Sequence, residues 1–296
     1  IEALGKTDRL LTFYDFSGMS GRHIGVESIT SSVNYGRLSL TAVSAVAVLG
    51  GSYIYIQNAW WSDQSSEFHF DDGSDLRYAK NIDKGGHFFG GILVADLFQS
   101  SLEWSGVKKR QSYLYGAAMG SFIQLSIEMK DAYAPSWGFS VWDYGAGTIG
   151  AFVPYFERYS PLGEYVDFKF SYYKRSNTYW ELGTIQKPDS PPYKHAYQDD
   201  YVNQTYWLSV YPFKKKGIDV GIAIGFGLDD TQTLVSNTKV GGNNEIYISL
   251  DYDMLQVLKK WDSPRARKWK HWLNYIKLPA PTIRISPELE FYPFFM

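Results

Sequence analysis

Hydrophobic residues follow one spacing in the first half of the chain and another in the second. Up to about residue 155, four segments carry apolar residues at helical spacing, and glycine, serine or proline bounds them. These signals predict helices over residues 37–61, 83–104, 107–131 and 140–155. Residues 1–36, which several glycines interrupt, are predicted to form an irregular arm with one short helix.

The first predicted helix contains a segment, residues 38–57, that has no charged residue and is about long enough to cross a bilayer. Hydroxyl and glycine residues lower its transfer energy into lipid and suit close contact between helices. These residues are Ser39, Thr41, Ser44, Gly50, Gly51 and Ser52. Two interpretations therefore stay open for this helix: a buried member of a helical bundle and a membrane span.

After Pro161 the spacing changes to alternation, which is typical of strands. Strands are predicted over residues 166–172, 206–211, 218–226, 245–253 and 282–292. In the segment 218–226, apolar side chains occupy one face and glycine or alanine the other, so this strand faces lipid or accommodates the bundle. The expected fold class is α+β. An N-terminal antiparallel four-helix bundle over residues 37–160 precedes a β-rich domain over residues 161–296, which forms an antiparallel sheet or a partial barrel.

Polar residues gather at the ends of the predicted helices. Consecutive helices joined by short connections pack antiparallel, so the ends of the first and third helices should meet the starts of the second and fourth. Asp83, His87, Glu128, Asp131 and Asp143 fall at these ends. A stripe of mostly small residues also runs along the third helix and lets a neighbour come close. It consists of Ser112, Gly116, Gly120, Gln124 and Glu128.

These positions predict a polar site at one end of the bundle. In this hypothesis His87 is a general base or a metal ligand, and carboxylates orient it or complete a metal shell. The candidate catalytic residues are His87, Glu128, Asp131 and Asp143, and the surrounding polar residues are Asp83, Lys84, His69, Gln124 and Ser140. Lys84 and His87 would balance the charge of the buried carboxylates.

Structural roles are the alternative for the same residues. Asp83 could cap the second helix, Ser140 and Asp143 form a capping-box pattern, and His87 could donate a hydrogen bond to Glu128. Zinc, manganese or iron could bind to His87 with the three candidate carboxylates, so a divalent metal is one possible cofactor. The chain has no His-Glu-x-x-His motif and no second histidine at helical spacing, which favours a site without a cofactor.

Composition restricts the class of protein. The net charge of −2 provides no global attraction to nucleic acid, and the absence of cysteine excludes disulfides and thiolate metal sites. Aromatic residues make up 18% of the chain, which is typical of β-structure and of proteins at membrane interfaces. We expect a protein of the cell envelope whose signal peptide has been removed from this numbering.

A basic aromatic helix is predicted near residues 255–277. Its Lys and Arg residues alternate with Trp, which suits a surface against anionic lipid head groups; a solvated helix with Trp packed on the sheet is the alternative. The residues of this predicted membrane or partner surface are Lys259, Lys260, Trp261, Arg265, Arg267, Lys268, Trp269 and Trp272.

Three ordered motifs carry a family resemblance: Asp83-Lys84-x-x-His87-Phe88, then Glu128-x-x-Asp131, then Gly138-Phe139-Ser140-x-x-Asp143 with a Gly/Ala run. With these motifs the chain resembles the YfiM-like family, a domain of unknown function described as a periplasmic or outer-membrane lipoprotein of bacteria. The resemblance centres on residues 68–155, and in the longer members it extends through 200–209, 247–253 and 279–281. The first motif is also similar, more loosely, to the opening of VanZ-like membrane proteins.

The resemblance implies a place in the periplasm or outer membrane and no activity. This sequence does not contain the cysteine that carries the lipid of a bacterial lipoprotein. We therefore expect a non-catalytic binding or structural protein at the periplasmic face of the outer membrane, in contact with lipid or an outer-membrane protein partner. The alternative is a metal- or histidine-dependent hydrolase of a lipid or envelope polymer, with its site at the end of the bundle.

Overall fold

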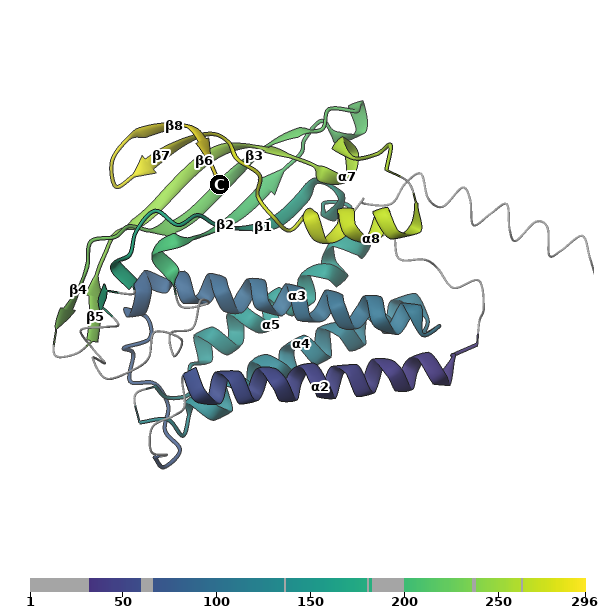
Figure 1. Cartoon of the computed structure of the whole chain (residues 1–296), viewed down its shortest axis with the longest axis horizontal. Coiled ribbons are helices and arrows are strands. Elements are labelled where there is room, and N and C mark those ends of the chain that lie inside the picture. The colour runs from purple at the N-terminus through teal and green to yellow at the C-terminus, as the bar shows by residue number, and fades with distance from the viewer. Residues whose placement is uncertain are drawn as a thin grey trace, which may run out of the picture.

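A computed structural model describes residues 32–59, 66–135, 137–179, 181–182, 200–235, 238–261 and 263–296. Most of the predicted N-terminal arm, residues 1–31, lies outside this range. Helices occupy the first half of the described chain and an antiparallel sheet the second, as the α+β class predicts (Figure 1).

Four long helices form close to their predicted positions. They are α2 (Tyr35–Ala59), α3 (Ile82–Trp104), α4 (Lys109–Asp131) and α5 (Val141–Tyr159). Two shorter helices, α7 (Met254–Val257) and α8 (Pro264–Leu273), follow later in the chain. The single basic helix predicted near residues 255–277 is therefore wrong, because Ser263 and Pro264 begin a new helix: the Ser263 hydroxyl caps α8 and accepts a hydrogen bond from the Ala266 N–H.

The tightly packed helices number three among those described, and the expected four-helix bundle is not confirmed. Helices α3, α4 and α5 share a common interior, whereas α2 lies beside them with its apolar side chains in the open, including Val43, Val46 and Ile54 at 64–72% exposure. At its start α2 is held to the end of α3, where the Asn34 N–H donates to the Ser105 carbonyl at 2.8 Å. Of the two interpretations left open for this helix, the buried bundle member is thus wrong for α2.

Six strands form one antiparallel sheet in the order β1-β2-β3-β6-β7-β8. Their bounds are β1 (Val166–Tyr172), β2 (Gln204–Val210), β3 (Val220–Leu228), β6 (Asn244–Tyr252), β7 (Ala280–Ser286) and β8 (Glu290–Phe295). A separate hairpin consists of β4 (Gln232–Val235) and β5 (Thr238–Gly241). The single strand predicted over 282–292 is wrong: Pro287 interrupts it, because proline has no N–H for a sheet hydrogen bond, and the chain turns back as β8.

The sheet curls around its own inner face. Segment 275–277 covers the free edge of β1, where the Phe170 N–H donates to the Tyr275 carbonyl at 2.8 Å and the Lys277 N–H to the Phe170 carbonyl at 2.9 Å. From there the chain crosses to β7, on the other side of β6. Strands β7 and β8 curve over the sheet in Figure 1. As a result, Lys169 of β1 reaches Asp251 of β6 at 2.8 Å, although two strands separate them.

Charged and polar side chains occupy this inner face. Lys169, Asp251 and Lys277 are almost completely buried, and the Tyr211 hydroxyl donates to Asp251 at 2.6 Å. The rings of Trp207 and Phe295 fill the remaining space. The interior is therefore a packed network of ion pairs and aromatic rings.

Apolar residues occupy the outer face in continuous cross-strand rows. One row crosses all six strands, through Phe168, Leu208, Ile224, Ile248, Ile283 and Phe291. A second row runs through Val166, Val210, Ile222 and Leu250. The helices cover one end of this face, at β1, β2 and the end of β3: Phe88 of α3 packs on Phe168 with ring centroids 5.0 Å apart, Phe89 stacks on Phe170 at 5.7 Å, and Phe226 of β3 packs on the cluster that contains Ile82 of α3.

Candidate functional site

The packing of α3 against α4 and α5 depends on positions where glycine allows close approach. A methyl group in place of a Gly150 hydrogen would lie 1.9 Å from the Phe88 carbonyl oxygen, and one on Gly116 would lie 2.5 Å from that of Ala95. Gly120 faces Ala151 in the same way. Because the helices alternate in direction, this contact brings the starts of α3 and α5 to the end of α4.

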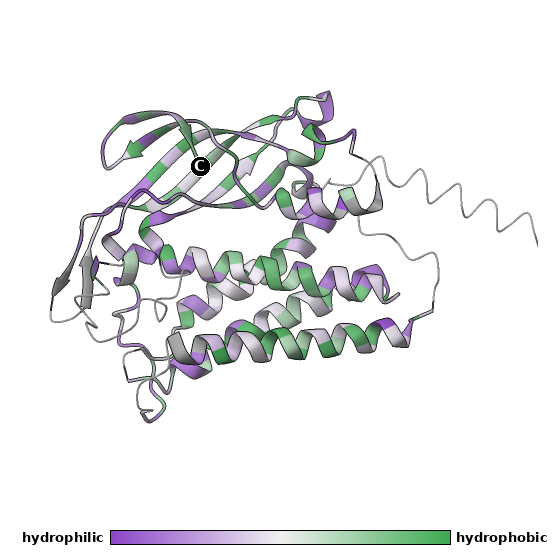
Figure 2. Cartoon of the chain, in the orientation of Figure 1, coloured by the Kyte–Doolittle hydropathy of each residue, from purple (hydrophilic) through white to green (hydrophobic). Residues whose placement is uncertain are grey.

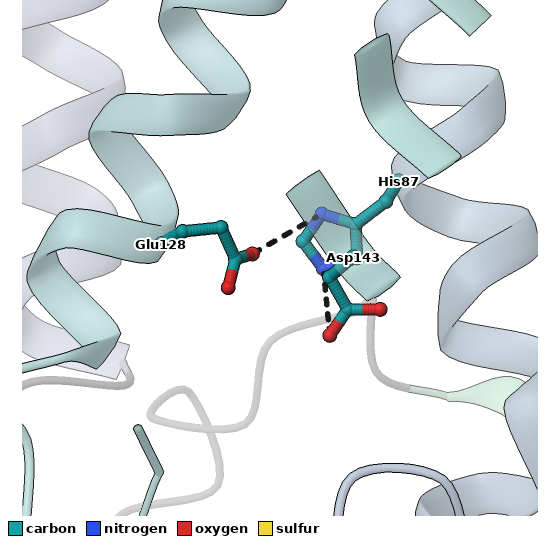
Figure 3. Close-up of side chains that lie close together, drawn as sticks. All are labelled: His87, Glu128 and Asp143. Atoms are coloured by element: carbon teal, nitrogen blue, oxygen red, sulfur yellow. Dashed lines mark ion pairs between the residues drawn. The ribbon is translucent and has the colours of Figure 1, made fainter. Parts of the chain in front are cut away.

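At that end, the ring of His87 lies between two carboxylates (Figure 3). Its Nδ1 lies 3.8 Å from Glu128 Oε1, and its Nε2 lies 4.0 Å from Asp143 Oδ2. Nδ1 donates a hydrogen bond to the Gln124 side-chain oxygen at 2.9 Å. Glu128 and Asp143 are 1% and 6% exposed, so both carboxylates lie inside the protein.

Lys84 lies at the centre of a second group of acids next to the first. Its Nζ is 2.8 Å from Asp75, 3.2 Å from Asp83 and 3.1 Å from Asp143. Asp143 therefore belongs to both groups. The ammonium of Lys84 occupies the position between these carboxylates where a metal ion would otherwise neutralise them.

Ser140 connects the two groups. Its N–H donates to Glu128 Oε2 at 3.0 Å, and its hydroxyl donates to Asp75 Oδ2 at 2.6 Å. The same hydroxyl oxygen accepts a hydrogen bond from the Asp143 N–H at 3.1 Å, so Ser140 is also the N-cap of α5. A structural role and a place in the cluster thus coexist at this residue.

Burial dominates the electrostatics. It raises the pKa of Asp83 to about 8, with the nearby charge of Asp143 adding to the effect, and it raises the pKa of Glu128 to about 9, with Asp131 and Asp143 adding. Burial also raises the pKa of Asp143. For Lys84, burial lowers the pKa but the charges of Asp83 and Asp143 more than offset it, so the pKa lies above its usual value.

The structure brings most of the sequence-predicted residues together and leaves two apart. His87, Glu128, Asp143, Asp83, Lys84, Gln124 and Ser140 meet within the cluster. Asp131 raises the pKa of Glu128 through its charge, and the Nδ1 of His69 instead faces the Glu67 carbonyl at 3.0 Å. The loop of His69 does reach this end, since the His69 N–H donates to the Ala132 carbonyl.

Asp75 is the cluster member that the motifs missed. It lies in the acidic loop before α3, and no helical spacing connects it to the other residues. The available signal was its short distance along the chain from Asp83 and Lys84. Asp71 folds this loop, because its carboxylate accepts hydrogen bonds from the N–H groups of Gly73 and Asp75 at 2.7 and 3.0 Å.

Two sets of three donors among the described residues could hold a metal ion: His87 with Glu128 and Asp143, and Asp75 with Asp83 and Asp143. In each set the ligand atoms lie within 4.8 Å of one another. The first set includes an imidazole, and the second already surrounds Lys84. Chemically, the arrangement can hold a cation or accept a proton at His87.

The predicted basic aromatic surface is divided. Lys259, Lys260, Trp261 and Trp269 are exposed, and Arg267 is half-buried. Trp272 instead packs on the helix–sheet core beside Tyr275. The side chains of Arg265 and Lys268 lie outside the described part of the structure. Trp272 therefore follows the alternative of a tryptophan packed on the sheet, and the membrane or partner surface stays a prediction for the exposed residues.

A family model described as "Predicted periplasmic lipoprotein (DUF2279)" matches residues 66–159, which include the acidic loop, α3, α4 and α5. No curated protein and no solved structure matches the chain. The match supports the coarser part of the family resemblance, a periplasmic lipoprotein domain, whereas the narrower likeness to YfiM-like and VanZ-like proteins stays a prediction.

The chain is a protein of the cell envelope, in the periplasm or the outer membrane. Helix α2 agrees with this location. Among the described helices it alone is long and apolar enough to cross a membrane, over Tyr35–Tyr55, and hydrophobic residues run along it in Figure 2. A signal sequence has the same length and composition.

Proposed function

We propose that this chain is a non-catalytic binding or structural protein at the periplasmic face of the outer membrane, and that the outer face of its sheet lies against membrane lipid. The observation that carries the proposal is the reversed polarity of the sheet. Its inner face holds the buried charges of Lys169 and Asp251, and its outer face holds continuous rows of aliphatic residues.

The exposed apolar area is contiguous. Ile222 and Ile224 of β3 are each 54% exposed, and their neighbours Ile248 and Leu250 of β6 are exposed as well. Water-soluble proteins rarely expose apolar patches larger than a few hundred square ångströms, and larger ones mark contact with a membrane or a partner. An apolar outside with a polar inside is also the arrangement that strands facing lipid adopt.

Two further features of the chain favour lipid over a protein partner as the occupant. Helix α2 is uncharged from Leu38 to Gln57 and exposes its apolar side chains, which suits the interior of a bilayer. The exposed residues Lys259, Lys260 and Trp261 suit the head-group region, where tryptophan and cationic side chains are enriched. Both features complement a sheet that contacts lipid.

The test measures co-sedimentation of the full chain with phosphatidylethanolamine vesicles, with and without phosphatidylglycerol. The double variant Ile222→Ser/Ile224→Ser should bind both kinds of vesicle at least fivefold more weakly. The variant Leu162→Ser, which removes an even more exposed aliphatic residue from a turn outside the rows, should bind as the wild type does. Neutralising Lys259 and Lys260 should lower binding to the phosphatidylglycerol vesicles alone. Equal binding by wild type and the double variant, or no binding to any vesicle, would refute lipid contact through the sheet and leave a protein partner as the occupant.

A second candidate function is hydrolysis of a lipid or an envelope polymer, and one observation favours it: the imidazole of His87 lies between two buried carboxylates. In this role His87 would accept the proton of an attacking water, and Glu128 or Asp143 would stabilise the charged ring. The variant His87→Gln should then abolish release of fatty acid or sugar from envelope extracts. Release that is unchanged in this variant would exclude the function.

A further inference from the structure

The buried cluster around His87 contains a carboxylate oxygen that no described residue satisfies with a hydrogen bond. Glu128 is 1% exposed, and its Oε2 accepts the Ser140 N–H, but its Oε1 has no hydrogen-bond partner among the described residues. This atom points towards His87 (Figure 3). A buried carboxylate oxygen without a donor is costly, so its position requires a proton or a cation.

Gln124 determines which nitrogen of His87 is available. The Gln124 side-chain oxygen can only accept a hydrogen bond, so the contact at 2.9 Å places the ring proton on Nδ1 of the neutral imidazole. The lone pair then lies on Nε2, which faces Asp143 Oδ2 at 4.0 Å. Metal-binding histidines are oriented in this way by a hydrogen bond from their other nitrogen.

The charges of the cluster balance only with protons on its carboxylates or with a further cation. Four buried or half-buried carboxylates meet here, those of Asp75, Asp83, Glu128 and Asp143. The Lys84 ammonium lies among Asp75, Asp83 and Asp143. No ion pair between Lys84 and Glu128 is present among the described residues. Among the described residues, His87 is therefore the basic side chain that lies beside Glu128.

We propose that His87, Glu128 and Asp143 bind one divalent transition-metal ion, with Gln124 as the residue that positions His87. The three ligand atoms lie within 4.8 Å of one another. A metal ion holds nitrogen and oxygen ligands at about 2.0–2.2 Å, so Nε2 and Oδ2 at their present separation suit two ligands of one ion with little movement. An imidazole with two carboxylates selects Zn²⁺ or Mn²⁺ over Mg²⁺ and Ca²⁺, which prefer oxygen ligands throughout. The proposal is independent of lipid contact through the sheet.

The first test is isothermal titration of the full chain, stripped with a chelator, with Zn²⁺ or Mn²⁺. We expect one ion per chain, and a dissociation constant that rises at least tenfold in Glu128→Gln and in His87→Gln. The matched controls are Glu67→Gln and His69→Gln, which remove the same residue types from the loop at the same end of the bundle. Both controls should bind as the wild type does. Wild-type protein that binds no ion, or ligand variants that bind as tightly as the controls, would overturn the site.

A spectroscopic measurement on the wild type covers the case in which a ligand variant does not fold. With one equivalent of Mn²⁺ bound, pulsed electron paramagnetic resonance should detect coupling to the nitrogen of a single imidazole. Coupling that persists in His69→Gln excludes His69 as its source, and coupling that is lost in a folded His87→Gln identifies His87. The absence of nitrogen coupling in the wild type would refute the proposal whatever the variants do.

Discussion

Replacing Gly150 by alanine tests whether the close contact of α3 and α5 holds the fold and the cluster together. The added methyl carbon would lie 1.9 Å from the Phe88 carbonyl oxygen and 2.7 Å from its carbonyl carbon. Non-bonded heavy atoms pack at about 3.5 Å, so the two helices would have to separate by roughly 1.5 Å at this point. The obstacle is backbone, which cannot rotate away as a side chain can.

The size of the effect follows from two opposing contributions. Overpacking of this kind costs about 1–3 kcal/mol, and alanine returns about 1 kcal/mol through its higher helix propensity. We therefore expect Gly150→Ala to lower the free energy of unfolding by up to about 2 kcal/mol. Gly145→Ala on the same helix is the matched control, because no atom lies within 4 Å of its added methyl group. The control should raise the free energy of unfolding by about 0.5–1 kcal/mol.

The assay is urea unfolding of both variants and the wild type, followed by tryptophan fluorescence and circular dichroism. The contrast in sign between the two variants is the result that matters, since both make the same chemical change on one helix. Because Phe88 follows His87 in the chain, Gly150→Ala should also weaken metal binding, and Gly145→Ala should not. Variants of equal stability would refute the view that the contact between α3 and α5 is too close for a side chain.

Two further predictions concern the buried charges inside the sheet. Lys169→Met removes the cation closest to the Asp251 carboxylate, at 2.8 Å in the wild type, and should lower the free energy of unfolding by about 3 kcal/mol. The double variant Lys169→Met/Asp251→Leu should recover part of this loss. A double variant no more stable than the single variant would contradict the pairing. Burial lowers the pKa of Lys277 to about 8, Asp251 and Lys169 being the charged groups that face it, so between pH 8 and 10 the unfolded chain holds a proton that the folded chain has released. Stability should therefore rise with pH in this window more steeply in the wild type than in Lys277→Met, by at most about 1.4 kcal/mol per pH unit in urea titrations, and parallel pH profiles would contradict this.

Local spacing was sufficient to predict the helices of the bundle and the first strand. Alternation from Val166 to Tyr172 predicted β1 with its observed bounds, and the apolar spacing of 107–131 predicted α4 to within two residues. The alternating direction of the helices also led from His87 to Glu128 and Asp143. These features depend on residues close together in the sequence and on short connections between helices, so the order of the residues is enough to predict them.

Other features depend on contacts between residues far apart, and spacing could not predict them. The uncharged stretch of α2 suits a buried helix and an exposed one equally, and only the packing of α3, α4 and α5 on one another leaves α2 outside. His69 lies at the expected end of the bundle, but the hydrogen bonds of its own loop turn its ring away. Asp75 joins the cluster because its loop folds back on Lys84.

By itself the sequence determined the α+β class, the envelope character of the composition, the course of the helices and three of the acids near one imidazole, those of Asp83, Glu128 and Asp143. The tertiary structure alone decided that Lys84 pairs with Asp75, Asp83 and Asp143 while Glu128 faces His87, and that the sheet curls with its charges inside. The physical reason is the same in both cases. The spacing of residues predicts which side chains share one face of a helix or strand. Which other element packs on that face depends on burial, and burial depends on the whole fold.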